Sequence, residues 1–146
     1  MTRLAAFGFI FALAIAKAAN AQTDEEVTAL LTPTVRTCEH APENGGTLEQ
    51  AICYRDEAVR QDQQLNDLWT RVVSGSSLAG REALRRSERR WIKERDATCH
   101  QEAAAYINST AAYMFNVCMT HETIRRILWL KKAGNRPDRI KTYALR

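Results

Sequence analysis

The residues with the clearest chemistry in this sequence are four cysteines, which could pair as two disulfides. They are Cys38, Cys53, Cys99 and Cys118. The first two flank the turn sequence 43–46, and the last two flank residues 107–110, where one helical pattern stops and another starts. We favour the pairs Cys38–Cys53 and Cys99–Cys118, because each closes a local hairpin. Four cysteines allow three pairings, and Cys53–Cys99 with Cys38–Cys118 stays open on spacing alone.

Histidines near these cysteines suggest a second chemistry, a zinc site. The imidazole ligands would come from His40, His100 and His121. Their spacing does not reproduce the Cys-x-x-Cys pairs of structural zinc sites, and an oxidising compartment favours disulfides over thiolates. We therefore expect disulfides, no metal and no other cofactor, with the three histidines on the surface near the disulfides.

Motifs of enzymatic catalysis are missing from the sequence. It contains no His-Glu-x-x-His, no Gly-x-Ser-x-Gly, no phosphate-binding glycine loop and no dinucleotide fingerprint. A cysteine nucleophile is excluded if all four cysteines are paired. We conclude that the protein is not an enzyme.

Charged residues interrupt the apolar stripes of two predicted helices, at Arg55, Asp62, Glu88 and Arg95. Paired carboxylates for glycoside hydrolysis would need an open cleft, which a slim helical bundle lacks. We interpret these charges as a paired network that fixes the register of packed helices. Antiparallel packing should bring Asp62 close to residues 88–90 and Arg55 near Asp96.

The N-terminus has the form of a cleavable export signal. Arg3 precedes the apolar run 4–16, and Ala19-Asn20-Ala21 matches the small-x-small cleavage pattern. The run is shorter than the ~20 residues that span a membrane, and no cysteine near the cut could carry a lipid. We expect residues 1–21 to be removed near Ala21 and the product to be periplasmic or secreted. The remainder is sufficient for one helical domain at 22–133, followed by a basic tail at 134–146.

Helical periodicity dominates the rest of the chain, and no segment alternates as a strand would. A capped first turn at 23–26 starts a short helix that Pro33 should end. Thr47 with Gln50 forms a capping-box pattern, which opens a long helix to about Val73. The apolar stripe of this helix includes Leu48, Ile52, Val59, Leu65 and Trp69.

Two further long helices complete the predicted fold. The second should run from about Ser77 to Tyr106, and the third from residues 108–110 to Gly134. The sequence therefore predicts an all-α fold, a three-helix antiparallel bundle with a short N-terminal helix and two disulfides.

The charge is small in total but unevenly placed. Without residues 1–21 the chain has 19 basic and 17 acidic residues, too weak a balance to argue for a nucleic-acid partner. The stretch 81–95 holds seven basic and three acidic residues, and the stretch from Arg125 onward holds eight basic residues and one acidic residue. We predict a candidate binding surface formed by Arg81, Arg85, Arg86, Arg90 and Lys93.

A spaced pattern of tryptophan, cysteine and charged residues connects the chain to a known family. Asp62-x-x-Leu65-Asn66-x-x-Trp69 is followed by Leu84-Arg85, by Glu88-Arg89-x-Trp91 and by Arg95-Asp96-x-x-Cys99. From about Cys38 to Leu130 the chain resembles the LprI-type lysozyme-inhibitor domain. Cys53, Cys118, Thr123 and Arg126 extend the resemblance, and Glu88 stands where the family has glutamine. The resemblance assigns as family-motif residues Asp62, Leu65, Asn66, Trp69, Leu84, Arg89, Trp91, Arg95 and Asp96.

The resemblance implies an exported, non-enzymatic binding module that inhibits a lysozyme or another peptidoglycan-degrading enzyme. Glu39, Glu43 or the turn 43–46 could enter the cleft of such an enzyme. Animal lysozymes are cationic and prefer acidic or neutral surfaces, whereas this chain concentrates arginine in its second long helix and tail. The alternative is an envelope-associated protein whose basic faces contact anionic lipid or wall polymer.

Overall fold

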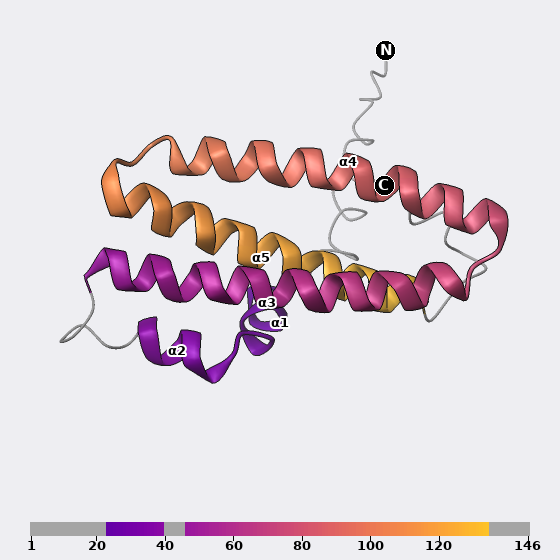
Figure 1. Ribbon diagram of the computed structural model, residues 1–146, viewed down its shortest axis with the longest axis horizontal. Helices are drawn as coiled ribbons and strands as arrows, with labels where there is room; N and C mark the ends of the chain where they lie inside the picture. The colour runs from indigo at the N-terminus through magenta and orange to yellow at the C-terminus, as the bar shows by residue number, and fades with distance from the viewer. Residues whose placement is uncertain (1–22, 40–45, 135–146) are drawn as a thin grey trace, which may run out of the picture.

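The computed structural model describes residues 23–39 and 46–134, which form five helices and no strand. Two short helices, α1 (Asp24–Ala29) and α2 (Pro33–Glu39), precede three long ones, α3 (Thr47–Ser74), α4 (Leu78–Ala103) and α5 (Asn108–Gly134). The long helices run side by side in up-down-up order, with α2 beside the N-terminal half of α3 (Figure 1). The predicted all-α bundle is confirmed. The expected signal peptide and all of the expected tail except Gly134 lie outside the described residues.

The N-terminal segment forms two short helices rather than one. Its capped first turn is confirmed, since the Thr23 hydroxyl accepts from the Glu26 amide and the Glu26 carboxylate accepts from the Thr23 amide. The prediction that Pro33 ends this helix is wrong. Helix α1 ends at Ala29, and Pro33 is the first residue of α2. Proline suits that position because the first amide of a helix has no partner within the helix.

The ends of the long helices follow their turn residues closely. The capping box expected at Thr47 is wrong, because Thr47 already lies inside α3 and Gly46 occupies the cap position without a side-chain bond. Ser77 caps α4 by accepting from the Gly80 amide at 3.2 Å. Helix α4 stops at Ala103, slightly before the expected Tyr106. Helix α5 starts at Asn108, whose φ of 56° is in the left-handed region that asparagine tolerates.

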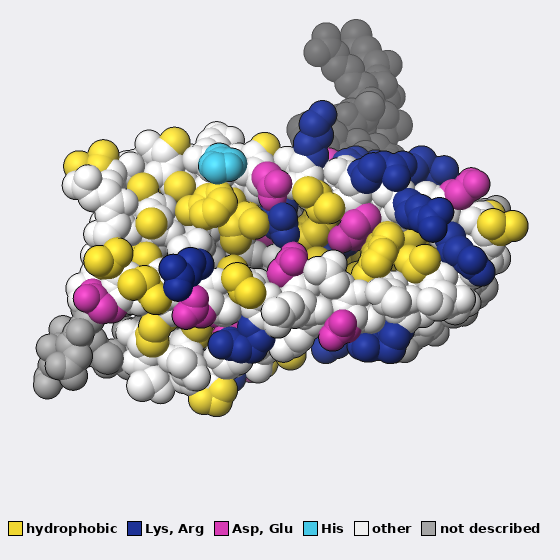
Figure 2. Space-filling model, viewed as in Figure 1, with side chains coloured by type: hydrophobic (Ala, Val, Ile, Leu, Met, Phe, Trp, Pro, Cys, Tyr) yellow, Lys and Arg dark blue, Asp and Glu magenta, His cyan; other side chains and the backbone are white. Residues whose placement is uncertain are grey.

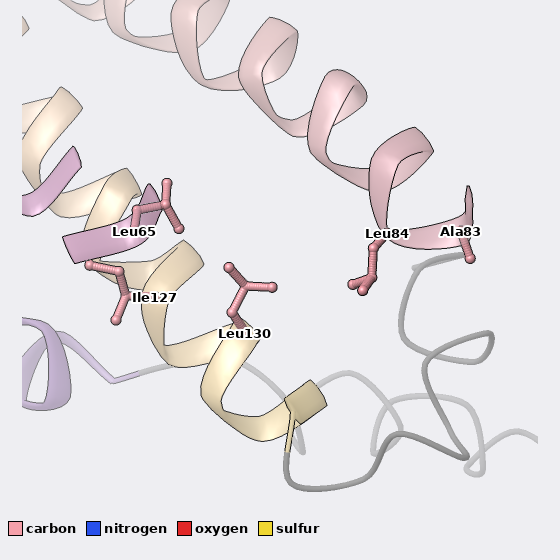
Figure 3. Packing of buried hydrophobic residues seen from close by; sticks show 5 residues of the cluster. All are labelled: Leu65, Ala83, Leu84, Ile127 and Leu130. Atoms are coloured by element: carbon pink, nitrogen blue, oxygen red, sulfur yellow. The ribbon is translucent and has the colours of Figure 1, made fainter. Parts of the chain in front are cut away.

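Helix α5 lies between α3 and α4, which approach each other only weakly. Near the turn at 75–77 the three helices converge on one hydrophobic cluster (Figure 3). Leu65 of α3, Leu84 of α4 and Leu130 of α5 point toward this common interior and are nearly inaccessible to solvent. Full burial of one aliphatic side chain stabilises the folded state by about 1.5–3 kcal/mol, so this cluster joins the helices at the turn end.

A second hydrophobic cluster joins the short N-terminal helices to the bundle. Val27, Leu31 and Val35 pack against Tyr54 of α3 and Ile124 of α5, and all five are buried. The helices α1 and α2 therefore complete the core.

Both favoured disulfides are present. Cys38–Cys53 joins α2 to α3 with a Cα–Cα distance of 6.5 Å, and Cys99–Cys118 joins α4 to α5 at 5.4 Å. Both distances lie in the usual range for disulfides. The two bonds lie in the half of the bundle that is distant from the turn at 75–77. Apolar packing thus joins the long helices at the turn end of the bundle, and the disulfides fix the other end.

Candidate interaction surfaces

Two motif residues of α4, Trp91 and Arg95, lie at a junction with α5 that is centred on the buried Arg126. The guanidinium of Arg126 lies between two tryptophan rings, with its carbon 5.4 Å from the ring centroid of Trp91 and 4.0 Å from that of Trp129. Its Nε and Nη2 donate to one carboxylate oxygen of Glu88 at 2.9 and 2.7 Å, and Nη2 also donates to the Ser87 hydroxyl at 3.1 Å. The positive charge of Arg126 is stabilised by the Glu88 carboxylate together with the faces of the two tryptophan rings.

Burial is the main electrostatic influence on Arg126, whose side chain is only 6% exposed. Loss of hydration lowers the pKa of Arg126, and the charge of Glu88 together with its hydrogen bond opposes that shift. A buried cation without its partner carries a large desolvation cost. Glu88 therefore has a definite structural role as the counter-charge of Arg126.

Arg95 extends the junction to α3. Its guanidinium lies 4.8 Å from the ring centroid of Trp91 and donates to Asp96 at 2.9 Å. The same group approaches Asp62 of α3 at 3.9 Å and the Thr123 hydroxyl of α5 at 3.5 Å. One arginine thus contacts all three long helices.

The remaining motif residues support the same junction, with one exception. Leu65, Leu84 and Trp69 belong to the hydrophobic cluster at the turn end, and the Asn66 amide donates to Asp62 at 3.1 Å. The exception is Arg89, which is exposed. We infer that the motif holds α4 in place, since α4 is rich in charge and has little apolar surface with which to pack.

The pairings expected for the charged stripes are wrong in detail. Glu88 pairs with Arg126 of α5, and Asp62 faces Arg95, instead of Asp62 meeting residues 88–90. Arg55 is exposed and pairs with its neighbour Asp56 at 2.9 Å, not with Asp96. The reason is that α5 packs against α4 and pairs with Glu88, while Asp62 of α3 meets α4 further along, at Arg95. The resemblance already marked Arg126 in the sequence, but nothing along the chain identified Glu88 as its partner.

The predicted basic surface lies on α4 and is largely exposed, apart from Arg81. That residue is half-buried, and its Nε donates to the Ser76 carbonyl at 2.9 Å, so it fastens the turn. Arg86 and Arg90 are 3.9 Å from Glu82 and Glu94, respectively. Arg85 and Lys93 are exposed and, like Arg89, form no ion pair with any residue that the structure describes. Figure 2 shows lysine and arginine side chains gathered along the N-terminal half of α4.

An exposed apolar strip on α3 was not anticipated as a surface. Leu48, Ile52 and Val59 are 57%, 42% and 55% exposed, and their spacing places them on one face of the helix. The sequence groups them with the buried Leu65 in one stripe. Helix α4 approaches α3 only weakly, and these three side chains stay uncovered. Hydrophobic side chains lie among charged ones on this face in Figure 2.

A buried carboxylate also escaped prediction. Glu57 of α3 is fully buried and accepts from the Thr32 amide at 3.2 Å, the Thr32 hydroxyl at 2.8 Å and the Gln61 amide at 2.8 Å. Arg60 forms a salt bridge to the same carboxylate. Thr32 lies in the connection between α1 and α2, so Glu57 fixes that connection to α3.

The histidines occupy different environments from one another. His100 is exposed and stacks on Phe115 with a centroid distance of 4.9 Å. His121 is half-buried and lies edge-on to Tyr54 at 6.3 Å, so the expectation that it is a surface residue is wrong. Within residues 23–39 and 46–134 no cluster of three histidine, cysteine or acidic side chains is arranged to hold a metal. His40, Glu43 and the side chain of Glu39 lie outside the described part.

Comparison with known proteins gives one match. A family model described as lysozyme inhibitor LprI matches residues 38–130, a range that contains both disulfides and the Arg126 junction. No curated protein and no solved structure matches the chain. Among the described helices, none has the length and apolar character needed to cross a membrane.

Proposed function

Because this chain belongs to the LprI family of lysozyme inhibitors, we propose that it is an exported, non-enzymatic binding module that inhibits a lysozyme or another peptidoglycan-degrading enzyme. The family match carries the proposal, since it spans α3, α4 and most of α5. The two disulfides support export, because disulfides persist in oxidising compartments. The absence of catalytic motifs in the sequence supports inhibition by binding rather than by chemistry.

The distribution of charge supports a cationic target despite the basic total. Helices α1, α2 and α3 carry nine acidic and four basic residues, whereas α4 and α5 carry six acidic and eleven basic residues. Two acids of α1 are engaged, since Asp24 pairs with Arg125 at 3.0 Å and Glu26 approaches Lys132 at 4.0 Å. Of the five acids of α3, Glu57 is buried, and Asp56 and Asp62 face Arg55 and Arg95. The acids that α3 still offers to a cationic enzyme are therefore Glu49 and Asp67.

The apolar strip of Leu48, Ile52 and Val59 supplies the second requirement of an inhibitor, a hydrophobic contact area. Apolar side chains that become buried at the centre of an interface stabilise the complex, and polar groups around them give orientation. Carboxylates lie on the same helix, and Glu49 and Asp67 are exposed and form no ion pair with any residue described in the structure. We therefore place the docking surface for a cationic peptidoglycan-degrading enzyme on α3.

Inhibition can be measured by the clearing of a cell-wall suspension with a panel of lysozymes and the purified, oxidised protein. We expect saturable inhibition of at least one cationic enzyme. Ile52→Arg should weaken that inhibition more than about tenfold, since a like charge facing a cationic partner costs at least the ~1.4 kcal/mol that corresponds to tenfold.

Ile92→Arg is the matched control, because Ile92 has the same side chain and nearly the same exposure, 40% against 42%, but lies on α4. It should retain inhibition within about twofold, since the control adds the same charge outside the proposed docking surface. Equal loss in the two variants would refute docking on α3. Failure of the unaltered protein to slow any peptidoglycan-degrading enzyme in the panel would refute inhibition itself.

A further inference from the structure

We propose that the outer face of α4 binds a linear anionic polymer, independently of the enzyme-binding surface on α3. The site, called here the cationic face, consists of Arg85, Arg86, Arg89, Arg90 and Lys93. All five side chains are exposed. Its ligand is a polymer that repeats a phosphate or carboxylate group along its length.

The cationic face has a high charge density. Five cations lie within residues 85–93, a stretch of helix that rises about 12 Å. The one acid in this stretch is Glu88, and its carboxylate is turned inward to Arg126. The negative charge of Glu88 is therefore paired with Arg126 and does not neutralise the cations on the outer surface of α4.

The spacing of the cations is unfavourable for the helix by itself. Arg85, Arg89 and Lys93 follow one another at intervals of four residues, which places like charges side by side on one face. The described residues provide no carboxylate partner for any of these three. Helix α4 nevertheless keeps its place, because the Arg126 junction and Cys99–Cys118 hold it. A row of external anions would relieve the repulsion and follow the row of cations.

A polymer suits the cationic face better than a membrane surface does. Helices that lie on lipid insert an apolar face between the headgroups. Trp91, the aromatic residue in this stretch, is in contact with Arg95 and Arg126 and faces the bundle. Ile92 is the one exposed large hydrophobic residue between Arg85 and Lys93. The cationic face can therefore form ion pairs with an anionic chain but has little with which to penetrate a bilayer.

Binding can be measured with two fluorescently labelled probes, long-chain polyphosphate and polygalacturonate, and with vesicles of phosphatidylglycerol as a third arm. The protein is produced with its export signal and purified with both disulfides formed. The double variant Arg85→Gln/Arg89→Gln should bind the preferred polymer about tenfold more weakly, since each exposed ion pair contributes a few-fold. Arg55→Gln/Arg71→Gln is the matched control, because it removes two exposed cations from α3 and gives the same net charge.

The control variant should keep polymer affinity within about twofold of the unaltered protein. Affinity should also fall steeply as the salt concentration rises from about 0.05 to 0.2 M, because exposed charges are screened over about 10 Å. The polyphosphate and polygalacturonate arms then identify whether phosphate or carboxylate is the preferred group. Enzyme inhibition by Arg85→Gln/Arg89→Gln should be unchanged, which separates this site from the surface on α3.

Three results would overturn the proposal. One is equal weakening in the two double variants, since binding would then follow net charge and not the cationic face. The second is binding of neither polymer at 0.05 M salt. The third is tight binding to vesicles that depends on Arg85 and Arg89 while both polymers bind weakly, which would make the surface a lipid-binding one.

Discussion

Replacing Glu88 with alanine tests whether the family motif is a structural junction. The change removes the carboxylate that accepts two bonds from Arg126 at 2.9 and 2.7 Å. It leaves a guanidinium that is 6% exposed, between two tryptophan rings and without its counter-charge. We expect the folded state to lose much of its stability while the fold itself is kept.

The magnitude follows from the burial of the pair. Removing one partner of a buried ion pair costs about 3–5 kcal/mol. Glu88 is 16% exposed and the aromatic contacts of Arg126 remain, so the lower end of that range, about 3 kcal/mol, is the expected loss. Glu88→Gln should cost only about 1 kcal/mol, since the amide oxygen can still accept from Arg126. At about 4 °C per kcal/mol for a domain of this size, Glu88→Ala should lower the Tm by about 12 °C.

Urea unfolding with the disulfides intact, followed by circular dichroism, gives these free energies. Glu94→Ala is the control, because Glu94 is 67% exposed and only approaches Arg90 at 3.9 Å. Its free energy of unfolding should change by less than about 0.5 kcal/mol. The double variant Glu88→Ala/Arg126→Met removes the uncompensated charge and should be more stable than Glu88→Ala alone. If the double variant is no more stable, the loss does not come from an unpaired buried cation and the reasoning is refuted.

Two further predictions concern the N-terminal helices and the disulfides. Glu57→Ala should cost about 2–4 kcal/mol, because it removes the acceptor of three hydrogen bonds from Thr32 and Gln61 and the partner of Arg60. Hydrogen exchange should accelerate in residues 24–37 more than in α5. Glu49→Ala, at an exposed position, is the control, and uniform acceleration would contradict a local role for Glu57. Opening either disulfide should cost about 3 kcal/mol, because each closes a short loop, of 15 residues for Cys38–Cys53 and 19 for Cys99–Cys118. Thermal melting of Cys38→Ala/Cys53→Ala and Cys99→Ala/Cys118→Ala measures this, and an unchanged Tm in both would show that the disulfides do not stabilise the domain.

Features that depend on neighbouring residues were predictable from the sequence. The helix break at 75–77 follows from its glycine and serine residues, which interrupt the helical period. The second break, expected at 107–110, lies at 104–107, directly before Asn108 at the start of α5. Those two breaks define hairpins, and the hairpins place Cys99 beside Cys118. Predictions from neighbouring residues were wrong for Pro33, which begins a helix, and for Thr47, which lies inside one. Proline and threonine are each compatible with more than one position near a helix start.

Features that depend on which helices face one another were not predictable. The sequence places Leu48, Ile52 and Val59 in the same stripe as Leu65, and only the arrangement of α3, α4 and α5 exposes the first three and buries the last. The neighbours of Asp62 and Arg55 were misassigned for the same reason. A periodic pattern gives the faces of a helix, but it does not give the helix that covers each face.

The sequence by itself determined the helices, the favoured disulfide pairs and the family, because turn residues, helical period and cysteine spacing act within short stretches of chain. The tertiary structure decided how the charges are used. By placing α5 between α3 and α4, it turns Glu88 inward to Arg126 and leaves the cations of residues 85–93 on the outside of α4. A count of charges along the chain could not show this, because it does not distinguish a carboxylate paired in the interior from one on the surface.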